Sequence, residues 1–338
     1  MKLSWLVLGK HHKDDLVQMA QESEKAGFET FWYADERFYM ETYSSLTYCS
    51  VHTDRIHLGP GVTDPYSRHP ALTAMALATL DHLSDGRAVL GLGAGNSGFR
   101  ELFIQRVHPA SAVRETVQVV RGLLAGETVT IDGKVIKLKN CKLGFQPERQ
   151  PPIIIASNGQ LIIRVAGEVA DGVMSSSVLV EPRVSEVLEL VDQGLMKSGR
   201  KRTDFNVWSR LNVAIHEDAK LAYQAAKPMI YNLICGKYPD TGMFDRLGLA
   251  LSDDLRHTVE TVGNTHDPEK LSWIIDQMSD EYVQKTCLAG TPDLIIDQLR
   301  NLDQAGFDGA ILYPIPVEDQ TYLDVLQAVS SEIAPAVL

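Results

Sequence analysis

Two adjacent carboxylates directly follow an apolar run near the start of the chain. Residues 30–34 lead into Asp35 and Glu36, and Arg37 comes next. A charged side chain just after a buried strand is in the usual position of a catalytic group in an α/β enzyme. We therefore expect Asp35 or Glu36 to act as a general acid or as a carboxylate that orients a ring. An ion pair with Arg37 on a solvated loop explains the same residues equally well.

A first glycine-rich segment spans residues 59–70 and contains Gly61, Val62 and Thr63. Glycine has no Cβ atom, so it lets the backbone approach a flat ligand closely. The alternative is an ordinary loop that leads into a helix beginning at Pro70, a residue type favoured in the first turn. Composition alone favours the loop.

A second glycine-rich segment spans residues 90–98 and includes Gly93 and Asn96. Its G-x-G-x-G pattern after a strand suggests a dinucleotide site. That site needs an acidic residue about twenty positions later, at the end of another strand. Glu115 has about that spacing but lies in a helical pattern, so the dinucleotide interpretation is weak. A glycine-rich strand end beside a ring-shaped ligand fits equally well.

A third segment, residues 153–161, runs from a buried strand through small polar residues into a helix. Free N–H groups at a helix start bind anions such as phosphate. Simple capping by Ser157 or Asn158 is the alternative here, and a solvated loop is the alternative for the serines after the next strand. The candidate phosphate-binding residues are Ala156, Ser157, Asn158, Gly159, Ser175 and Ser176.

Composition excludes several other functions. The chain has 338 residues and a formal net charge of -12, which disfavours nucleic acid as a partner. It contains no H-E-x-x-H, P-loop or G-x-S-x-G motif. Its four cysteines are far apart, so we expect reduced thiols and no metal site. The apolar N-terminal run is too short for a signal peptide, and no run reaches the roughly 18 residues of a membrane helix. These features predict a cytoplasmic protein that does not enter a membrane.

Short apolar runs alternate with helical patterns along most of the chain. We expect strands at 3–8, 30–34, 56–62, 88–93, 152–156, 172–175, 206–215 and 309–313. We expect helices at about 14–26, 42–52, 70–84, 112–125, 160–170, 182–198 and 292–305. Strands buried on both faces and separated by helices indicate a parallel sheet. The glycine stops at Gly27 and Gly306 are typical of the turns that join such helices to strands.

Eight such strands predict an α/β fold of the closed (β/α)8 type, the TIM barrel, with an open doubly wound sheet as the rival. Two segments interrupt the alternation. Residues 128–143 alternate around Asp132 and Gly133, which predicts a β-hairpin with a type I′ turn after strand 4. Residues 217–285 are mostly helical and form an insertion between strands 7 and 8. No linker separates independent domains, so we expect residues 1–338 to form a single domain.

Three motifs resemble the luciferase-like superfamily, in particular the branch that uses the deazaflavin coenzyme F-420. They are GVTDPYSRHP at 61–70, AGEVADGV at 166–173 and GTPD at 290–293. The nearest likeness is to methylenetetrahydromethanopterin reductase and its relatives, and it extends over most of the chain. The resemblance implies a barrel enzyme that binds F-420, or alternatively FMN, and works as a homodimer on a small-molecule substrate.

The resemblance also implies roles for particular residues. In the family, a non-proline cis peptide in the third strand backs the coenzyme ring, and the matching bond is Gly61–Val62. Asp35 matches a position that contacts the ring, and Asn96 matches a contact after strand 4. The phosphate-binding turn after strand 5 matches residues 156–159.

The chain departs from its relatives around the substrate. Leu6 replaces a glutamate of the reductases. Ala94 replaces a glutamate of the sugar-phosphate dehydrogenases, and Glu36 and Met40 replace their histidine and tryptophan. The residues of the coenzyme site therefore match those of the family more fully than the residues of the substrate site do.

Three functions follow as hypotheses. The first is an F-420-dependent oxidoreductase that transfers a hydride between the deazaflavin C5 and a small organic substrate. The second is an FMN-dependent monooxygenase supplied by a flavin reductase. The third is a non-catalytic flavin-binding barrel protein.

Overall fold

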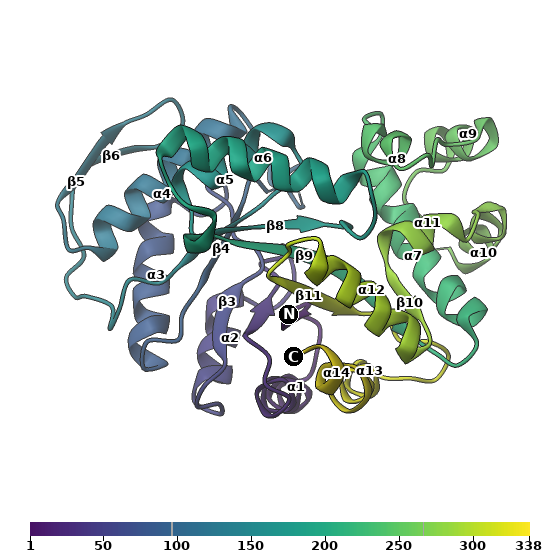
Figure 1. Cartoon of the computed structure of the whole chain (residues 1–338). Coiled ribbons are helices and arrows are strands. Elements are labelled where there is room, and N and C mark those ends of the chain that lie inside the picture. Colours follow the sequence, from purple (N-terminus) through teal and green to yellow (C-terminus); the bar gives the residue numbers. More distant parts are fainter. Residues whose placement is uncertain (96, 266) are drawn as a thin grey trace.

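The computed structural model describes residues 1–95, 97–265 and 267–338, and within them the predicted barrel is present. Eight parallel strands follow one another round the barrel in the order β3-β2-β1-β11-β9-β8-β7-β4 (Figure 1). They are β1 Lys2–Val7, β2 Thr30–Tyr33, β3 His57–Pro60, β4 Leu90–Gly93, β7 Ile153–Ala156, β8 Gly172–Ser176, β9 Asn206–Ile215 and β11 Gly309–Pro314.

The barrel closes between β3 and β4 through single bridges. Leu58 bridges Ala88 and Thr63 bridges Leu92, both in parallel. The Thr63 amide donates to the Gly91 carbonyl at 3.1 Å, and the Gly93 amide donates to the Thr63 carbonyl at 2.9 Å. The open-sheet alternative is therefore wrong, because an open sheet would leave both of these edges unpaired.

Helices on the outside of the barrel bury one face each against the strands. They are α1 Lys13–Lys25, α2 Thr42–Ser50, α3 Pro70–Leu83, α4 Pro109–Leu124, α5 Gln160–Val169, α6 Arg183–Ser198 and α12 Pro292–Gln304. In α1 the buried residues Leu16, Met19, Ala20 and Ser23 recur at helical spacing. Gly27 and Gly306 follow their helices with φ of +82° and +103°, the left-handed geometry expected of a helix stop.

Large side chains fill the inside of the barrel. The interior cluster consists of Leu6, Trp32, Val89, Ile154, Met174, Trp208, Ile311 and Tyr313. Five partly exposed residues pack against this cluster: Leu8, Ala34, Val62, Ala156 and Met229. The barrel is thus a packed core and not an open channel.

The predicted hairpin forms from β5 Val129–Asp132 and β6 Lys137–Cys141. The predicted type I′ turn is wrong, because four residues connect the strands and neither Asp132 nor Gly133 has a positive φ. Instead the Glu115 carboxylate on α4 accepts hydrogen bonds from the amides of Lys134, Val135 and Ile136 at 2.9–3.0 Å. A distant carboxylate, rather than local turn chemistry, holds this loop.

The insertion between β9 and β11 is helical, as expected. It contains α7 Ala219–Lys237, α8 Gly242–Arg246, α9 Asp253–Thr261, α10 Pro268–Gln277 and α11 Glu281–Thr286. It ends in a short strand that the sequence analysis missed, β10 Leu288–Gly290, which pairs in parallel with β9 outside the barrel. Figure 1 shows these helices grouped at one side of the barrel.

The chain finishes with α13 Tyr322–Ala328, η2 Val329–Ile333 and α14 Ala334–Val337, and a short 3-10 turn, η1 Arg202–Asp204, precedes β9. None of these was expected from the sequence. Among the described residues, no helix is both long enough and apolar enough to cross a membrane.

Candidate active site

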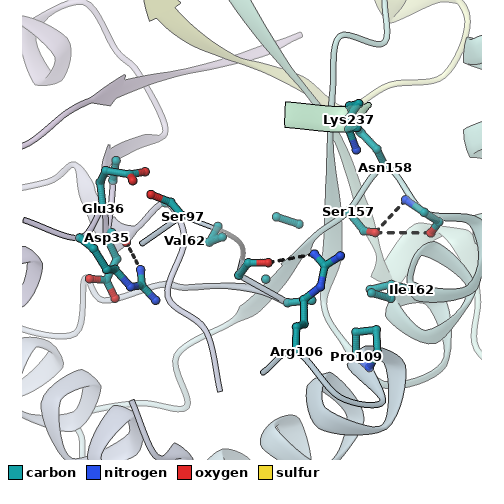
Figure 2. A pocket seen from close by; sticks show the side chains of 18 residues that line it. Asp35, Glu36, Val62, Ser97, Arg106, Pro109, Ser157, Asn158, Ile162 and Lys237 are labelled. Atoms are coloured by element: carbon teal, nitrogen blue, oxygen red, sulfur yellow. Dashed lines mark hydrogen bonds between the residues drawn. The ribbon is translucent and has the colours of Figure 1, made fainter. Parts of the chain in front are cut away.

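A cavity of about 490 Å³ opens at the carboxyl ends of β2, β3, β4 and β7 (Figure 2). This is the end of the barrel where (β/α)8 enzymes place their chemistry. The lining residues are Ala34, Asp35, Glu36, Arg37, Gly61, Val62, Gly93, Ala94, Gly95, Ser97, Arg106, Pro109, Ala156, Ser157, Asn158, Gly159, Ile162 and Lys237.

One end of the cavity carries two carboxylates. Asp35 and Glu36 lie there together in Figure 2, and Arg37, the next residue of the chain, also lines the cavity. Arg37 forms its ion pair with the buried Asp64, not with Asp35 or Glu36, and donates to the Asp35 carbonyl. Burial raises the pKa of Glu36 above its usual value, and Asp35 adds to that effect while Arg37 opposes it. Both carboxylates are therefore free of the ion pair that the solvated-loop alternative required.

The middle of the cavity is walled by glycines and by Val62. The Gly61–Val62 peptide is cis, as the resemblance implied. A Cβ atom on Gly61 would lie 2.9 Å from the Leu6 side chain, and one on Gly93 would lie 2.7 Å from the Val62 side chain. Any other residue at position 61 or 93 would clash with these side chains and displace the wall of the cavity. The smooth wall suits a flat ring.

The other end of the cavity has free hydrogen-bond donors. The helix α5 begins after Gly159 with no side chain hydrogen-bonded to its first turn. The Ser157 hydroxyl accepts from the Gly159 amide at 2.9 Å, and Asn158 Oδ1 accepts from the Ser175 hydroxyl and the Ser176 amide at 2.8 Å. Neither side chain therefore caps α5, and the amides of Gln160 and Leu161 in its first turn remain available to an anion.

Two cations stand beside this helix start. Arg106 and Lys237 both line the cavity, and Figure 2 shows them on the same side as Ser157, opposite Asp35 and Glu36. Neither is within 4.0 Å of a carboxylate in the described part of the chain. Burial lowers the pKa of Lys237, Asp240 raises it in part and Arg106 lowers it further. The cavity thus runs from a carboxylate end to a cationic end.

Most of the residues predicted from the sequence meet in this cavity. Those that line it are Asp35, Glu36, Gly61, Val62, Gly93, Ala156, Ser157, Asn158 and Gly159. Thr63, Ser175 and Ser176 do not line it: Thr63 and Ser175 are fully buried, and the Ser176 amide donates to Asn158 Oδ1. Asn96 lies outside the described residues.

Sequence reasoning missed Arg106 and Lys237. Lys237 is the last residue of α7 in the insertion, so no local pattern marks it as a neighbour of Ser157. Arg106 lies in the loop after β4, and its guanidinium donates to the Gly95 carbonyl at 3.0 Å. The sequence signal that could have identified Arg106 is its position as a basic residue shortly after the glycine-rich run 90–98.

Comparison with known proteins gives a consistent picture. The family model described as luciferase-like monooxygenase matches residues 1–309. A 5,10-methylenetetrahydromethanopterin reductase of Archaeoglobus fulgidus is 34% identical over 294 residues, which cover 86% of this chain and 87% of the relative. An F-420-dependent glucose-6-phosphate dehydrogenase of Intrasporangium calvum is 26% identical, over 93% of this chain and 92% of the relative.

The fold is also that of a solved structure. The coenzyme F-420-dependent tetrahydromethanopterin reductase of Methanopyrus kandleri superposes with a TM-score of 0.88 at 24% sequence identity. The match covers 100% of this chain and 99% of the other. It agrees with the barrel and the helical insertion described above.

Proposed function

The chain belongs to the luciferase-like monooxygenase family, and from this premise we propose that it is a coenzyme F-420-dependent oxidoreductase. It transfers a hydride between the deazaflavin C5 and a small organic substrate. Relatives named as reductases and as F-420-dependent dehydrogenases place it among oxidoreductases.

The polarity of the cavity carries this proposal. F-420 combines a flat tricyclic ring with a phosphate and a chain of carboxylates. The glycine wall at Gly61 and Gly93 accommodates the ring, and the uncapped start of α5 accommodates the phosphate. Arg106 and Lys237 supply positive charge where the carboxylates would extend. A volume of about 490 Å³ is within the range of coenzyme and ligand sites.

The residues of the chain provide binding, orientation and proton handling, while the coenzyme supplies the hydride chemistry. Asp35 lies at the ring end, with its Oδ1 accepting from the Thr42 hydroxyl at 3.3 Å. Glu36 holds its proton at higher pH than an ordinary glutamate, so it is the better general acid of the two. Ala156, Ser157, Asn158 and Gly159 bind the phosphate, with Ser175 and Ser176 fixing Asn158 from behind.

The proposal extends to the whole protein. We propose a cytoplasmic homodimer in which residues 1–338 form one domain. One apolar cluster supports the single domain, since it joins Ala226 and Ile234 of α7 to Ala214 of β9 and Ile315 after β11. Helices α2 and α3 support the homodimer, because they leave Tyr48, Val51, Leu72 and Met75 exposed.

A coenzyme titration tests the proposal. Purified protein should quench the fluorescence of F-420 and bind it at least tenfold more tightly than FMN. FMN lacks the carboxylate chain that Arg106 and Lys237 would contact, so the same titration separates the two coenzymes. Tighter binding of FMN, together with oxygen consumption when a flavin reductase is added, would establish the monooxygenase instead.

A further inference from the structure

One partly buried cation on a barrel strand is not used by the coenzyme site. Arg210 lies on β9 two residues after Trp208, a member of the barrel interior cluster, and two residues before the buried Asn212. Since alternate residues of a strand share a face, Arg210 also points into the barrel. Its guanidinium lies 5.0 Å from the centre of the Tyr313 ring, another member of that cluster.

The position of β9 places Arg210 opposite the coenzyme wall. In the order β3-β2-β1-β11-β9-β8-β7-β4, β9 is four strands from β3 in either direction round the barrel (Figure 1). Gly61 and Val62 directly follow β3. A ring resting on Val62 would therefore turn its open face towards β9, and a substrate stacked on that face would lie between the ring and β9.

Arg210 has few protein partners for a partly buried arginine. Its one recorded hydrogen bond runs from Nη1 to Asn212 Oδ1 at 2.8 Å, and no carboxylate of the described residues lies within 4.0 Å. A guanidinium has five N–H donors and keeps its charge inside proteins. Burial lowers the pKa of Arg210, which reflects the cost of holding this charge without an anion nearby.

Two buried arginines show how the chain pairs most of such a group when its role is structural. Arg87 donates to the carbonyls of Ser84, Ile56, Ser50 and Thr53 and to the Thr53 hydroxyl. Arg183 pairs with Glu186 at 2.7 Å and donates to the Asn158 carbonyl at 3.0 Å. Arg210 is partly exposed and has neither a carboxylate nor a set of carbonyls, so its remaining N–H groups are open to a ligand.

We propose that Arg210 binds an anionic group of the substrate, and that the substrate is a carboxylate held between the coenzyme ring and β9. Asn212 orients the guanidinium by accepting from Nη1, and the N–H groups on Nε and Nη2 are left to donate to a carboxylate. The inference rests on the proposed function, because that function places the ring on Val62. It adds the class of substrate, which the coenzyme site alone does not define.

A pair of probes with one shape and different charge tests this assignment. Trifluoroacetate and trifluoroacetamide are nearly isosteric, and fluorine-19 NMR detects their binding to protein saturated with F-420. We expect the wild type to bind the anion at least tenfold more tightly than the amide. Arg210→Gln, which keeps a donor for Asn212, should remove that preference, and Arg210→Lys should retain part of it. Arg300→Met, at an exposed arginine of α12, measures anion binding to the surface and should leave the preference intact.

Each outcome has a defined consequence. An unchanged preference in Arg210→Gln, or no preference in the wild type, overturns the inference. Arg210→Met serves the same comparison if the Gln variant does not fold. The titration is repeated without coenzyme: an Arg210-dependent preference in a protein that fails to bind F-420 would refute the proposed function and keep the anion site. A wild type that binds F-420 but shows no preference for the anion would refute the anion site and keep the proposed function.

Discussion

At the scale of single residues, Glu36 and Asp35 are neighbours in the chain with different environments. Glu36 is held by burial at a raised pKa, with Asp35 adding to the shift. Asp35 accepts from Thr42 and is close to the ring wall. The sequence indicated both residues but not which one would keep its proton, because that depends on burial in the folded chain.

The first prediction concerns the pH dependence of turnover. If Glu36 donates the proton in the direction that reduces the substrate, kcat/KM should fall as the pH rises through its raised pKa. Glu36→Gln should abolish this limb of the profile and lower kcat roughly 100-fold, the lower end of general acid catalysis. Asp35→Asn is the matched comparison and should keep the limb. A profile that is unchanged in Glu36→Gln contradicts the assignment.

A second prediction concerns Lys237. If its ammonium contacts the anionic part of F-420, Lys237→Met should raise the Kd for F-420 about tenfold, as expected for one charge-assisted hydrogen bond. Because the pKa of Lys237 is lowered, F-420 affinity should fall at a pH below that at which an ordinary lysine loses its proton. Fluorescence titration measures both effects. Lys220→Met, at an exposed lysine of the same helix, should bind F-420 as the wild type does.

The residues that sequence reasoning found and missed differ in how far their partners lie along the chain. Glycines and small polar residues at strand ends were recognisable because each belongs to a local junction. Lys237 was not, since its approach to Ser157 depends on how the insertion folds back. Ser175 does not line the cavity; its hydroxyl donates to Asn158 Oδ1, so a role in coenzyme binding stays a prediction.

At the scale of elements, strands and helices of the barrel followed from the alternation of apolar runs, and the hairpin followed from its own pattern. Its turn did not, because Glu115 of α4 replaces local turn chemistry. The strand β10 was missed for a similar reason. It has three residues, too few for a periodic pattern, and exists through its pairing with β9.

The third prediction follows from Glu115. Three backbone hydrogen bonds lower the pKa of its carboxyl, despite some burial that raises it. A depressed folded-state pKa contributes stability above the unfolded pKa, and that stability is lost as the pH falls through the folded pKa. Glu115→Gln should therefore lower the free energy of unfolding by about 1 kcal/mol at pH 7, and the difference should shrink on acidification. Urea denaturation at pH 7 and in acid checks this, and an equal loss at both values would contradict it.

At the scale of the whole molecule, the number and order of the eight barrel strands were predictable, and the closure of the barrel agrees with the parallel arrangement. The relative placement of distant segments was not. Arg210 illustrates the boundary: a charged residue in the apolar strand 206–215 is visible in the sequence, but its position opposite Val62 requires the closed barrel. The closed barrel therefore identifies Arg210 as a candidate binding group, which the sequence alone does not.

The fourth prediction concerns assembly. If α2 and α3 form the homodimer contact, Leu72→Glu combined with Met75→Glu should produce a monomer in light scattering, because two charges would be buried in the interface. Met196→Glu is the control, since Met196 is an equally apolar and 80% exposed residue of α6. A monomeric wild type, or a double variant that stays dimeric, would refute the contact.

The helix α7 reaches both halves of the site, with Met229 packed beside the barrel interior and Lys237 at the cationic end of the cavity. Under the proposed function, this single stretch of chain would contact the coenzyme through Lys237 and lie beside the substrate through Met229. Exchanging residues 219–286 with those of a relative should shift coenzyme preference and substrate preference in one step, since neither contact can be transplanted without the other. Such enzymes would then acquire new specificities by replacement of this whole segment, while the barrel stays unchanged.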